Sequence, residues 1–161
     1  MLFGKGNIGS RWLELFAREQ EALSARTGFD IYWRAWRTAT RSPSLTTRRK
    51  RATRSRCFCG CARIRSTNLV VLDVTASAPL AHHYLDFASH GFHVISANKV
   101  AGASDSQSWR QLRDAFTKTS RHWLYNATVG AGLPINYTVR DLRDSGDTIL
   151  AISGIFSGTL S

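Results

Sequence analysis

The sequence predicts an α/β fold, a doubly wound parallel sheet with helices, and three observations lead to this prediction. Short apolar runs of strand type alternate with longer segments of helical periodicity. The links between them are short, and a glycine-rich turn lies between the first strand and the first helix. Alternating strands and helices are typical of parallel sheets with right-handed crossovers. We expect an incomplete domain of this kind, followed by only the start of a second region.

Five segments have the pattern of strands or of extended chain. The first is short, because only Met1–Phe3 precede the glycine turn. Leu69–Asp73 is a continuous apolar run, which is typical of a buried strand in a parallel sheet. The other three expected segments are Phe92–Ser96, His122–Asn126 and Thr148–Phe156.

Four segments have helical periodicity. Apolar residues from Ile8 to Leu23 recur at helical spacing between charged ones, which predicts an amphipathic helix that lies on a core. Gly28 is a suitable residue to end this helix. The other three expected helices are Pro79–His90, Asp105–Thr119 and Leu133–Arg143.

A strongly basic block interrupts this pattern. The chain has 161 residues, with 22 Lys and Arg against 11 Asp and Glu, and a formal net charge of +11. Ten arginines, one lysine and no acidic residue fall between positions 31 and 66, so the rest of the chain is neutral overall. Because the block, taken as residues 31–68, lacks apolar periodicity, we expect it to be disordered.

Three interpretations of the basic block compete. In the first it is a nucleic-acid-binding arm, in which Arg48–Arg51 contact phosphates while Trp33 and Trp36 stack on bases. In the second its three cysteines hold a metal, although their alternate spacing and the lack of a nearby histidine argue against a tetrahedral site. In the third, which we favour, two reading-frame shifts produced the block, since out-of-frame GC-rich DNA encodes many arginines and few acidic residues. The three cysteines are Cys57, Cys59 and Cys61.

The turn Gly4-x-Gly6-x-x-Gly9 has the spacing and the strand-to-helix context of a dinucleotide-binding turn in a Rossmann-like domain. Gly4 permits the tight turn, Gly6 lets a pyrophosphate approach the backbone, and Gly9 lets the helix pack closely on the strand. The N–H groups of the helix N-terminus, with Lys5 beside them, then attract phosphate. A tight turn that binds no ligand is the alternative interpretation.

Both NAD and NADP are candidate cofactors. The acidic residue that binds a ribose 2′-hydroxyl is expected about 20 residues beyond the glycines, at the end of the second strand. Asp30 has about that spacing, but it stands where that strand begins, so we reject it. Arg34 and Arg37 could be taken for ligands of a 2′-phosphate, but both lie inside the basic block, so we do not use them to choose between NAD and NADP.

Four segments stand out beside the glycine turn, namely Asp73-Val-Thr-Ala-Ser77, Ser96-Ala-Asn-Lys99, Tyr125–Pro134 and Gly154–Ser161. On these motifs, residues 1–30 and about 69–161 resemble the homoserine dehydrogenases, above all those fused to aspartokinases. The resemblance implies that Thr75 lies beside the cofactor and that Lys99 is a catalytic residue that reaches the nicotinamide and the substrate. The remaining cofactor-binding residues that it implies are Gly4, Gly6, Asn7, Ile8 and Gly9.

The resemblance also implies a site for a monovalent cation, usually sodium, in the loop that begins at Asn126. Backbone carbonyl groups would be the ligands, and they belong to Asn126, Val129, Ala131 and Leu133. A glycine-rich turn that only packs is the alternative. The pair His82 and His83 has no third ligand near it in sequence, so we expect no metal site there.

The resemblance implies a domain layout and an activity. Residues 1–30 and 69–147 would form the NAD(P)-binding domain, and 148–161 the start of the catalytic and dimerisation region. Full-length relatives would be cytoplasmic homo-oligomers that interconvert L-homoserine and L-aspartate 4-semialdehyde in threonine and methionine biosynthesis. With Lys99 as its only catalytic lysine, we expect little or no turnover from this chain. A basic nucleic-acid-binding protein with a Rossmann-like core is the alternative, and no apolar run has the roughly 18 residues of a membrane span.

Overall fold

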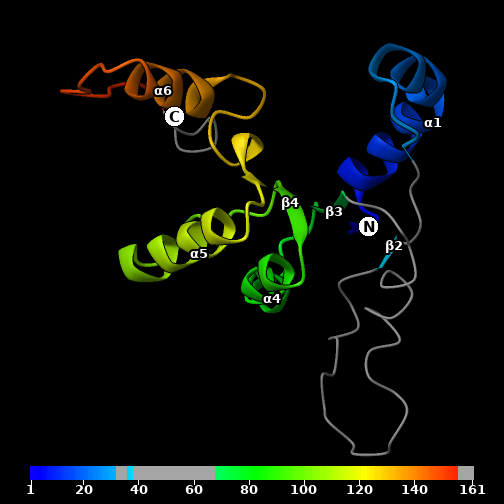
Figure 1. The fold of residues 1–161 in the computed structure, drawn as a ribbon, viewed down its shortest axis with the longest axis horizontal. Coiled ribbons are helices and arrows are strands. Elements are labelled where there is room, and N and C mark those ends of the chain that lie inside the picture. Colours follow the sequence, from blue (N-terminus) through cyan, green and yellow to red (C-terminus); the bar gives the residue numbers. More distant parts are fainter. Residues whose placement is uncertain (32–35, 38–67, 156–161) are drawn as a thin grey trace, which may run out of the picture.

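The computed structural model describes residues 1–31, 36–37 and 68–155, which are built around a five-stranded sheet (Figure 1). All paired strands are parallel, in the order β2-β1-β3-β4-β5. The strands are β1 Leu2–Phe3, β2 Trp36–Arg37, β3 Leu69–Asp73, β4 Phe92–Ser96 and β5 Trp123–Leu124. The chain builds outward from β1 in both directions, so the sheet is doubly wound as predicted and its switch point lies between β1 and β3.

Helices alternate with these strands along the described chain. They are α1 Asn7–Thr27, α3 Ala78–Ala81, α4 Tyr84–Ser89, α5 Ser106–Lys118, the 3₁₀ helix η1 Asn126–Thr128 and α6 Ile135–Asp144. The start of α5 follows from its cap, because the Asp105 carboxylate accepts the N–H groups of Gln107 at 2.9 Å and Ser108 at 3.0 Å. These hydrogen bonds, chiefly those from Ser108, hold the pKa of Asp105 below its ordinary value.

The hydrophobic core lies between one face of the sheet and helices α4 and α5. Alternate strand residues face this core, as expected for a period of two. Its largest members are the buried side chains Val71, Tyr84, Phe87, Phe92, Val94, Leu112, Phe116 and Trp123. The Tyr84 and Trp123 rings meet edge to face with centroids 6.0 Å apart. Because burial of one such side chain stabilises a fold by about 1.5–3 kcal/mol, this layer holds the described domain together.

The opposite face of the sheet is much less covered, and this corrects the expectation that α1 lies on a core. Gly9 is the single buried residue of α1, and Figure 1 shows the helix running away from the sheet. Trp12 and Phe16 stack on each other instead, with ring centroids 5.1 Å apart. Helical spacing creates an apolar stripe but does not say what packs on it. Three strand residues on this face are between 37% and 39% exposed, namely Val70, Ile95 and Leu124.

One part of the basic block has regular structure. Trp36–Arg37 form β2, with Leu2 opposite Trp36, so the expectation that all of 31–68 is disordered is wrong at these two positions. The reason is that backbone pairing with β1 needs no apolar periodicity, and two residues are too few to show one. Residues 32–35 and 38–67 lie outside the described residues, and with them Arg48–Arg51 and the three cysteines.

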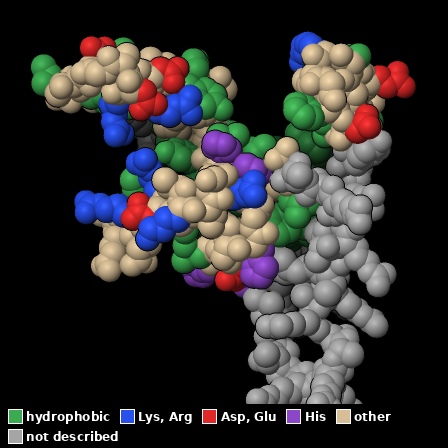
Figure 2. All heavy atoms as spheres, viewed as in Figure 1, with side chains coloured by type: hydrophobic (Ala, Val, Ile, Leu, Met, Phe, Trp, Pro, Cys, Tyr) green, Lys and Arg blue, Asp and Glu red, His purple; other side chains and the backbone are tan. Residues whose placement is uncertain are grey.

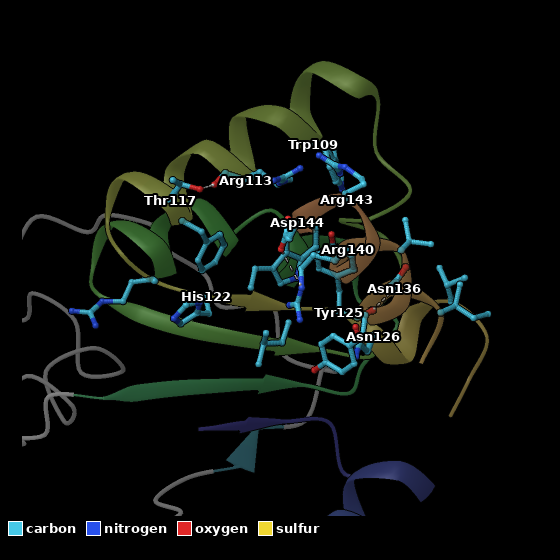
Figure 3. Close-up of a pocket in the computed structure, with 18 of the residues that line it drawn as sticks. Trp109, Arg113, Thr117, His122, Tyr125, Asn126, Asn136, Arg140, Arg143 and Asp144 are labelled. Atoms are coloured by element: carbon cyan, nitrogen blue, oxygen red, sulfur yellow. Dashed lines mark hydrogen bonds and ion pairs between the residues drawn. The ribbon is translucent and has the colours of Figure 1, made fainter. Parts of the chain in front are cut away.

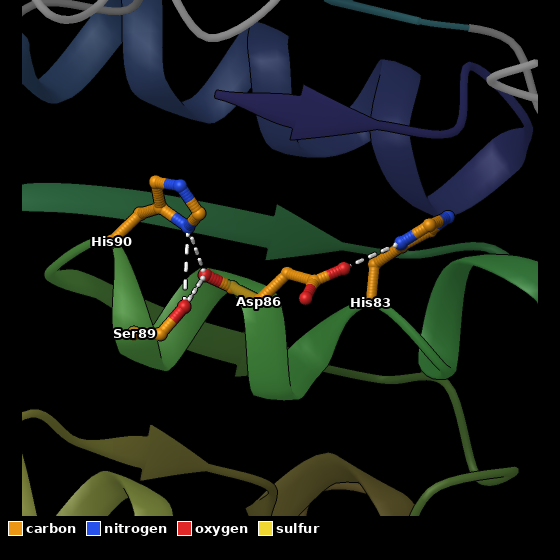
Figure 4. Close-up of polar contacts among 4 residues, drawn as sticks. All are labelled: His83, Asp86, Ser89 and His90. Carbon is orange, nitrogen blue, oxygen red and sulfur yellow. Dashed lines mark hydrogen bonds and ion pairs between the residues drawn. The ribbon is translucent and has the colours of Figure 1, made fainter. Parts of the chain in front are cut away.

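The helix expected over Pro79–His90 is divided into α3 and α4. The His83 N–H group bonds to the Leu80 carbonyl, three residues back, and this tighter turn separates the two helices. The His83 Nδ1 atom then lies 3.0 Å from the Asp86 carboxylate in the first turn of α4 (Figure 4). The two histidines expected to lie inside a helix therefore form the break.

One expectation about the last third of the chain needs correction. The strand predicted over His122–Asn126 is paired only at Trp123–Leu124, because Asn126 already begins η1. The segment expected to be extended, Thr148–Phe156, has no strand pairing in its described part, up to residue 155. The expected last helix is present as α6, which begins after Pro134. No helix in the described ranges is long and apolar enough to cross a membrane.

Candidate functional site

The glycine turn connects β1 to α1, and its three glycines differ in their surroundings. Gly4 has a φ of +98°, in the left-handed region that favours glycine. A Cβ atom on Gly9 would collide with the backbone oxygen of Gly4, so helix and strand approach at a distance that only glycine allows. Nothing lies within 4 Å of the Cβ position of Gly6. The tight turn predicted for Gly4 and the close packing predicted for Gly9 are present.

The N-terminus of α1 is open toward solvent at this turn. Gly6 is the N-cap residue and provides no side chain to bond the first N–H groups. The first bond of the helix runs from the Ser10 N–H group to the Gly6 carbonyl, at 2.9 Å. Asn7 and Ile8 are exposed, and Ile8 is 61% exposed. This helix end therefore offers N–H groups and a partial positive charge to an anion.

The loop after β3 lies directly against the glycine turn. The Cβ position of Gly4 is 3.0 Å from the Val74 carbonyl oxygen and 3.1 Å from the Thr75 Cγ2 atom. The Val74 N–H group also donates a 3.0 Å hydrogen bond to the Phe3 carbonyl at the end of β1. Thr75 is therefore held beside the turn, half-buried, at the switch point of the sheet.

A buried carboxylate ends β3. Asp73 is 0% exposed, and its Oδ1 atom accepts hydrogen bonds from the Thr75 N–H group at 2.9 Å and the Thr75 hydroxyl at 2.7 Å. Its Oδ2 atom accepts from the Tyr84 hydroxyl at 2.7 Å and the Asn98 amide at 3.0 Å. Burial, followed by the negative charge of Asp73, raises the pKa of Tyr84 far above its ordinary value, so the phenol stays a donor.

The loop after β4 carries Asn98, which is 1% exposed, and Lys99, which is exposed. The Asn98 amide donates to Asp73 and to the Ser77 carbonyl at 3.0 Å, and its oxygen accepts the Val100 N–H group at 3.1 Å. The sequence analysis gave no role to Asp73, Tyr84 or Asn98. The position of Asp73 at the end of a buried apolar run could have indicated this network, since a buried charge requires hydrogen-bond partners.

These loops all lie at the carboxyl edge of one parallel sheet, since Gly4 follows β1, Thr75 follows β3 and Lys99 follows β4. In open α/β sheets, ligands bind at this edge, beside the switch point. A glycine turn that opens a helix there binds the pyrophosphate of a dinucleotide. The fold and the site together define the class of doubly wound dinucleotide-binding domains.

The comparison with protein families assigns the chain within this class. The family described as "Homoserine dehydrogenase, NAD binding domain" matches residues 4–126, and the chain belongs to the homoserine dehydrogenase family. "Bifunctional aspartokinase/homoserine dehydrogenase 2" of Escherichia coli (strain K12) is 63% identical over 175 aligned residues, which take in 100% of this chain and 22% of that protein. "Homoserine dehydrogenase" of Emericella nidulans is 32% identical over 99% of this chain and 47% of its own length. The chain thus spans about a fifth of the bacterial relative and under half of the fungal one.

Solved structures agree with the fold. S. aureus homoserine dehydrogenase at pH 7.5 has a TM-score of 0.58, with 17% identity over 80% of this chain and 32% of that one. A hyperthermophilic archaeal homoserine dehydrogenase in complex with NADPH has a TM-score of 0.55, with 14% identity over 87% of this chain and 47% of that one. At these identities the likeness shows the fold alone, and it confirms the predicted Rossmann-like class.

The loop predicted to hold a cation is a series of tight turns. Gly130 has a φ of +69° and Ala131 a φ of +50°, and the Leu133 N–H group bonds to the Gly130 carbonyl at 2.9 Å. The Val129 N–H group approaches the Asn126 carbonyl at 3.5 Å. The cation-binding role of these carbonyls stays a prediction. Within the described ranges, no group of three His, Cys, Asp or Glu side chains is arranged to hold a metal ion.

A cavity of about 520 Å³ lies between α5 and α6, away from the glycine turn (Figure 3). The Arg113 guanidinium stands 4.8 Å from the Trp109 ring centre, and Arg140 stands 5.0 Å from that of Tyr137. Figure 2 shows acidic and basic side chains interspersed over these two helices. Asn126 lines the cavity, whereas Thr75, Lys99 and the glycine turn do not. The sequence analysis missed the cavity because it depends on how α5 and α6 pack.

Proposed function

We propose that this chain is the nucleotide-binding part of an NAD(P)-dependent enzyme that interconverts L-homoserine and L-aspartate 4-semialdehyde. The observation that carries the proposal is the contact of Gly4 with Val74 and Thr75 at the switch point, beside the open N-terminus of α1. The family match and the relatives named for this activity support it. Because a related structure is described as a complex with NADPH, NADPH is the first cofactor to test.

The residues at the turn fit a dinucleotide pyrophosphate. The empty space at the Cβ position of Gly6 leaves room for a phosphate to approach the backbone. The uncapped first turn of α1 offers the N–H groups of Asn7, Ile8 and Gly9. Lys5 adds a positive charge to the same turn. Gly4, Gly6, Asn7, Ile8 and Gly9 would therefore hold the phosphates, and Thr75 would border the cofactor.

Lys99 is the residue that we propose for the chemistry. Bound NAD(P) would supply or accept the hydride at the carbon of the aldehyde or alcohol. When the aldehyde is reduced, its oxygen must gain a proton as the carbon gains the hydride. Lys99 is exposed at the carboxyl end of β4, where its Nζ–H group would donate a hydrogen bond to that oxygen and stabilise the developing alkoxide. With this one lysine, we expect little or no turnover from the chain by itself.

We also propose that the carbonyl groups of Asn126, Val129, Ala131 and Leu133 hold a monovalent cation, with sodium as the candidate. The family match, which reaches Asn126, supports this proposal, and the tight turns with left-handed residues at 130 and 131 give the loop a defined backbone. Addition of sodium chloride should raise the melting temperature more than potassium chloride at equal ionic strength. Equal shifts for the two salts would contradict the cation site.

We also propose that the full-length protein is a homo-oligomer and that it is located in the cytoplasm.

The proposed function is tested by titration of the 161-residue chain with NADPH and NADH, followed by nicotinamide fluorescence. We expect saturable binding of at least one of them. Gly6→Ala should weaken it about tenfold while the chain stays folded, because the new methyl group fills the phosphate approach but touches no protein atom. Gly102→Ala is the matched control, since its Cβ position meets only the Lys99 carbonyl oxygen at an ordinary 3.7 Å.

The competing function is nucleic-acid binding through the basic block, which the ten arginines between 31 and 66 favour. Duplex DNA should then bind with an affinity that falls steeply as salt is raised. Salt-sensitive DNA binding together with no binding of either dinucleotide would overturn the dehydrogenase assignment.

A further inference from the structure

The Asp73 carboxylate is the meeting point of the two loops that carry Thr75 and Lys99. It is fully buried, and no lysine or arginine in the described part of the chain forms an ion pair with it. Its charge is instead balanced by four hydrogen bonds, two to each oxygen atom. A buried carboxylate is costly unless it is bonded in this way, so the loops that provide its donors are tied to its position.

Each oxygen of Asp73 serves a different loop. The Oδ1 atom accepts both donors of Thr75, and the Thr75 hydroxyl in turn accepts the Ser77 N–H group at 3.1 Å. The Oδ2 atom accepts from Asn98, whose amide group also bonds to the Ser77 carbonyl. The loop after β3 is therefore folded around one oxygen and bonded to the loop after β4 through the other.

The bond network also reaches the backbone around Lys99. The Asn98 oxygen accepts the Val100 N–H group, so the amide of Asn98 fixes the residues on both sides of Lys99. The Ala97 N–H group donates to the Asp73 carbonyl at 2.8 Å, which sets where this loop leaves the sheet. The side chain of Lys99 stays exposed, while these hydrogen bonds hold the backbone on either side of it.

We propose that Asp73 is a positioning residue that locks the loops 74–77 and 97–100 in one joint arrangement, so that Thr75 and Lys99 face the bound dinucleotide together. This inference rests on the proposed function for its consequence, but the coupling of the two loops is a property of the chain without any ligand. Asp73 touches neither the cofactor nor the substrate in this account; it acts only through the loops that it joins.

Asp73→Asn is the variant that breaks the coupling with the least change in shape. Its remaining carbonyl oxygen can still accept from Thr75, and its amide can still bond to the Tyr84 hydroxyl, which also accepts. Only toward Asn98 does a donor now face a donor. The substitution therefore removes the Asp73–Asn98 bond selectively, and it leaves the Ser77 carbonyl as the one direct acceptor of the Asn98 amide in the other loop.

Tyr84→Phe is the matched control. It removes another hydrogen bond to the same Oδ2 atom, but that donor comes from α4 and belongs to neither loop. Because Tyr84 is fully buried, its loss should lower the unfolding temperature, as the loss of the Asn98 bond should. Each variant thus loses one hydrogen bond at the Oδ2 position, but only Asp73→Asn loses a bond between the two loops.

Amide hydrogen exchange of the ligand-free 161-residue chain tests the coupling. In Asp73→Asn, we expect the Thr75, Ser77 and Val100 amides to exchange about tenfold faster, while the amides of β3 and β4 stay protected. In Tyr84→Phe, the loop amides should stay within about threefold of the parent chain, since the bond between Asp73 and Asn98 is intact. NADPH should bind Asp73→Asn about tenfold more weakly and Tyr84→Phe within about twofold of the parent, at a temperature where all are folded.

Two results would overturn the inference. One is faster exchange in Asp73→Asn at Thr75 and Ser77 with Val100 unchanged, since the loops would then be independent. The other is loop exchange in Tyr84→Phe equal to that in Asp73→Asn, which would make the effect a general loss of stability. If the parent chain binds neither NADPH nor NADH, the proposed function fails, and the exchange comparison still decides whether Asp73 couples the loops.

Discussion

Two glycine-rich loops, 4–9 and 126–133, look alike in sequence but differ in what surrounds their glycines. In the first, Gly9 packs on the backbone of Gly4, and Gly4 packs on the backbone of Val74. In the second, the Cβ position of Gly130 meets the side chain of Ile135, and Gly132 meets nothing within 4 Å. Backbone at the end of a sheet cannot move aside, whereas the far end of an isoleucine can.

This difference shows that glycine density alone does not measure how strictly a loop is constrained. The turn after β1 is fixed by contacts between backbone atoms of three segments, so its shape is part of the sheet. The later loop is fixed by its own turns and by a side chain at the start of α6. Substitutions of the packed glycines Gly4 and Gly9 should therefore destabilise the fold more than substitutions in the later loop, and second-site changes should relieve the loss only in the later loop.

Gly9→Ala should have the largest effect of all. Its methyl group would collide with the Gly4 carbonyl, and neither segment can shift without breaking β1 pairing. We expect a loss of roughly 3 kcal/mol in the free energy of unfolding, at the top of the usual range for overpacking. Urea unfolding followed by tryptophan fluorescence measures it. A loss below about 1 kcal/mol would mean that the turn is not fixed as described.

Gly130→Ala should cost less, about 1–2 kcal/mol, because a φ of +69° is strained for alanine and the methyl group meets Ile135. The double variant Gly130→Ala with Ile135→Val should recover part of this loss, since valine lacks the Cδ1 atom in contact. A double-mutant cycle measured by urea unfolding gives the coupling energy, expected at about 0.5–1 kcal/mol. Strict additivity of the two single changes would count against the packing described here.

Gly132→Ala should be neutral or slightly stabilising, by about 0.5 kcal/mol. Its Cβ position is empty and its φ lies outside the left-handed region, so alanine mainly lowers the entropy of the unfolded chain. The measurement is again the urea midpoint. Clear destabilisation would mean that Gly132 makes a contact absent from this description. Gly6 also has an empty Cβ position, but its substitution should affect ligand binding alone.

The pH dependence of stability should arise outside the two glycine-rich loops, at His93 on β4. Burial, and then the positive charge of Arg121, lowers the pKa of His93 below its ordinary 6.5. The pKa of His93 is lower in the folded chain than in the unfolded one. Its contribution to the free energy of unfolding is therefore fully present above about pH 6.5, and it is lost as the pH drops toward the folded pKa. His93→Asn should make the melting temperature depend less on pH between pH 7 and pH 5. An unchanged profile would show that another group is responsible.

Much of the fold was predictable from local patterns. Buried parallel strands leave continuous apolar runs, as in Leu69–Asp73, and a capping aspartate marks the start of a helix, as Asp105 does for α5. The divided helix at His83 and the short strand β5 were not predictable, because both depend on which backbone groups find partners. Within the site, glycine spacing predicted the turn, but the partners of Asp73 lie up to 25 residues away along the chain.

Spacing and residue type alone were enough to predict the class of the fold, the position of the glycine turn and the family. Packing between distant segments was needed to show that Gly9 lies on Gly4, that Thr75 borders the turn, and that Asp73 joins the loops of Thr75 and Lys99. It also decided that α1 leaves its apolar stripe largely uncovered among the described residues. The physical reason is that periodicity specifies which faces are apolar, whereas hydrogen bonds and packing between distant segments specify what those faces meet.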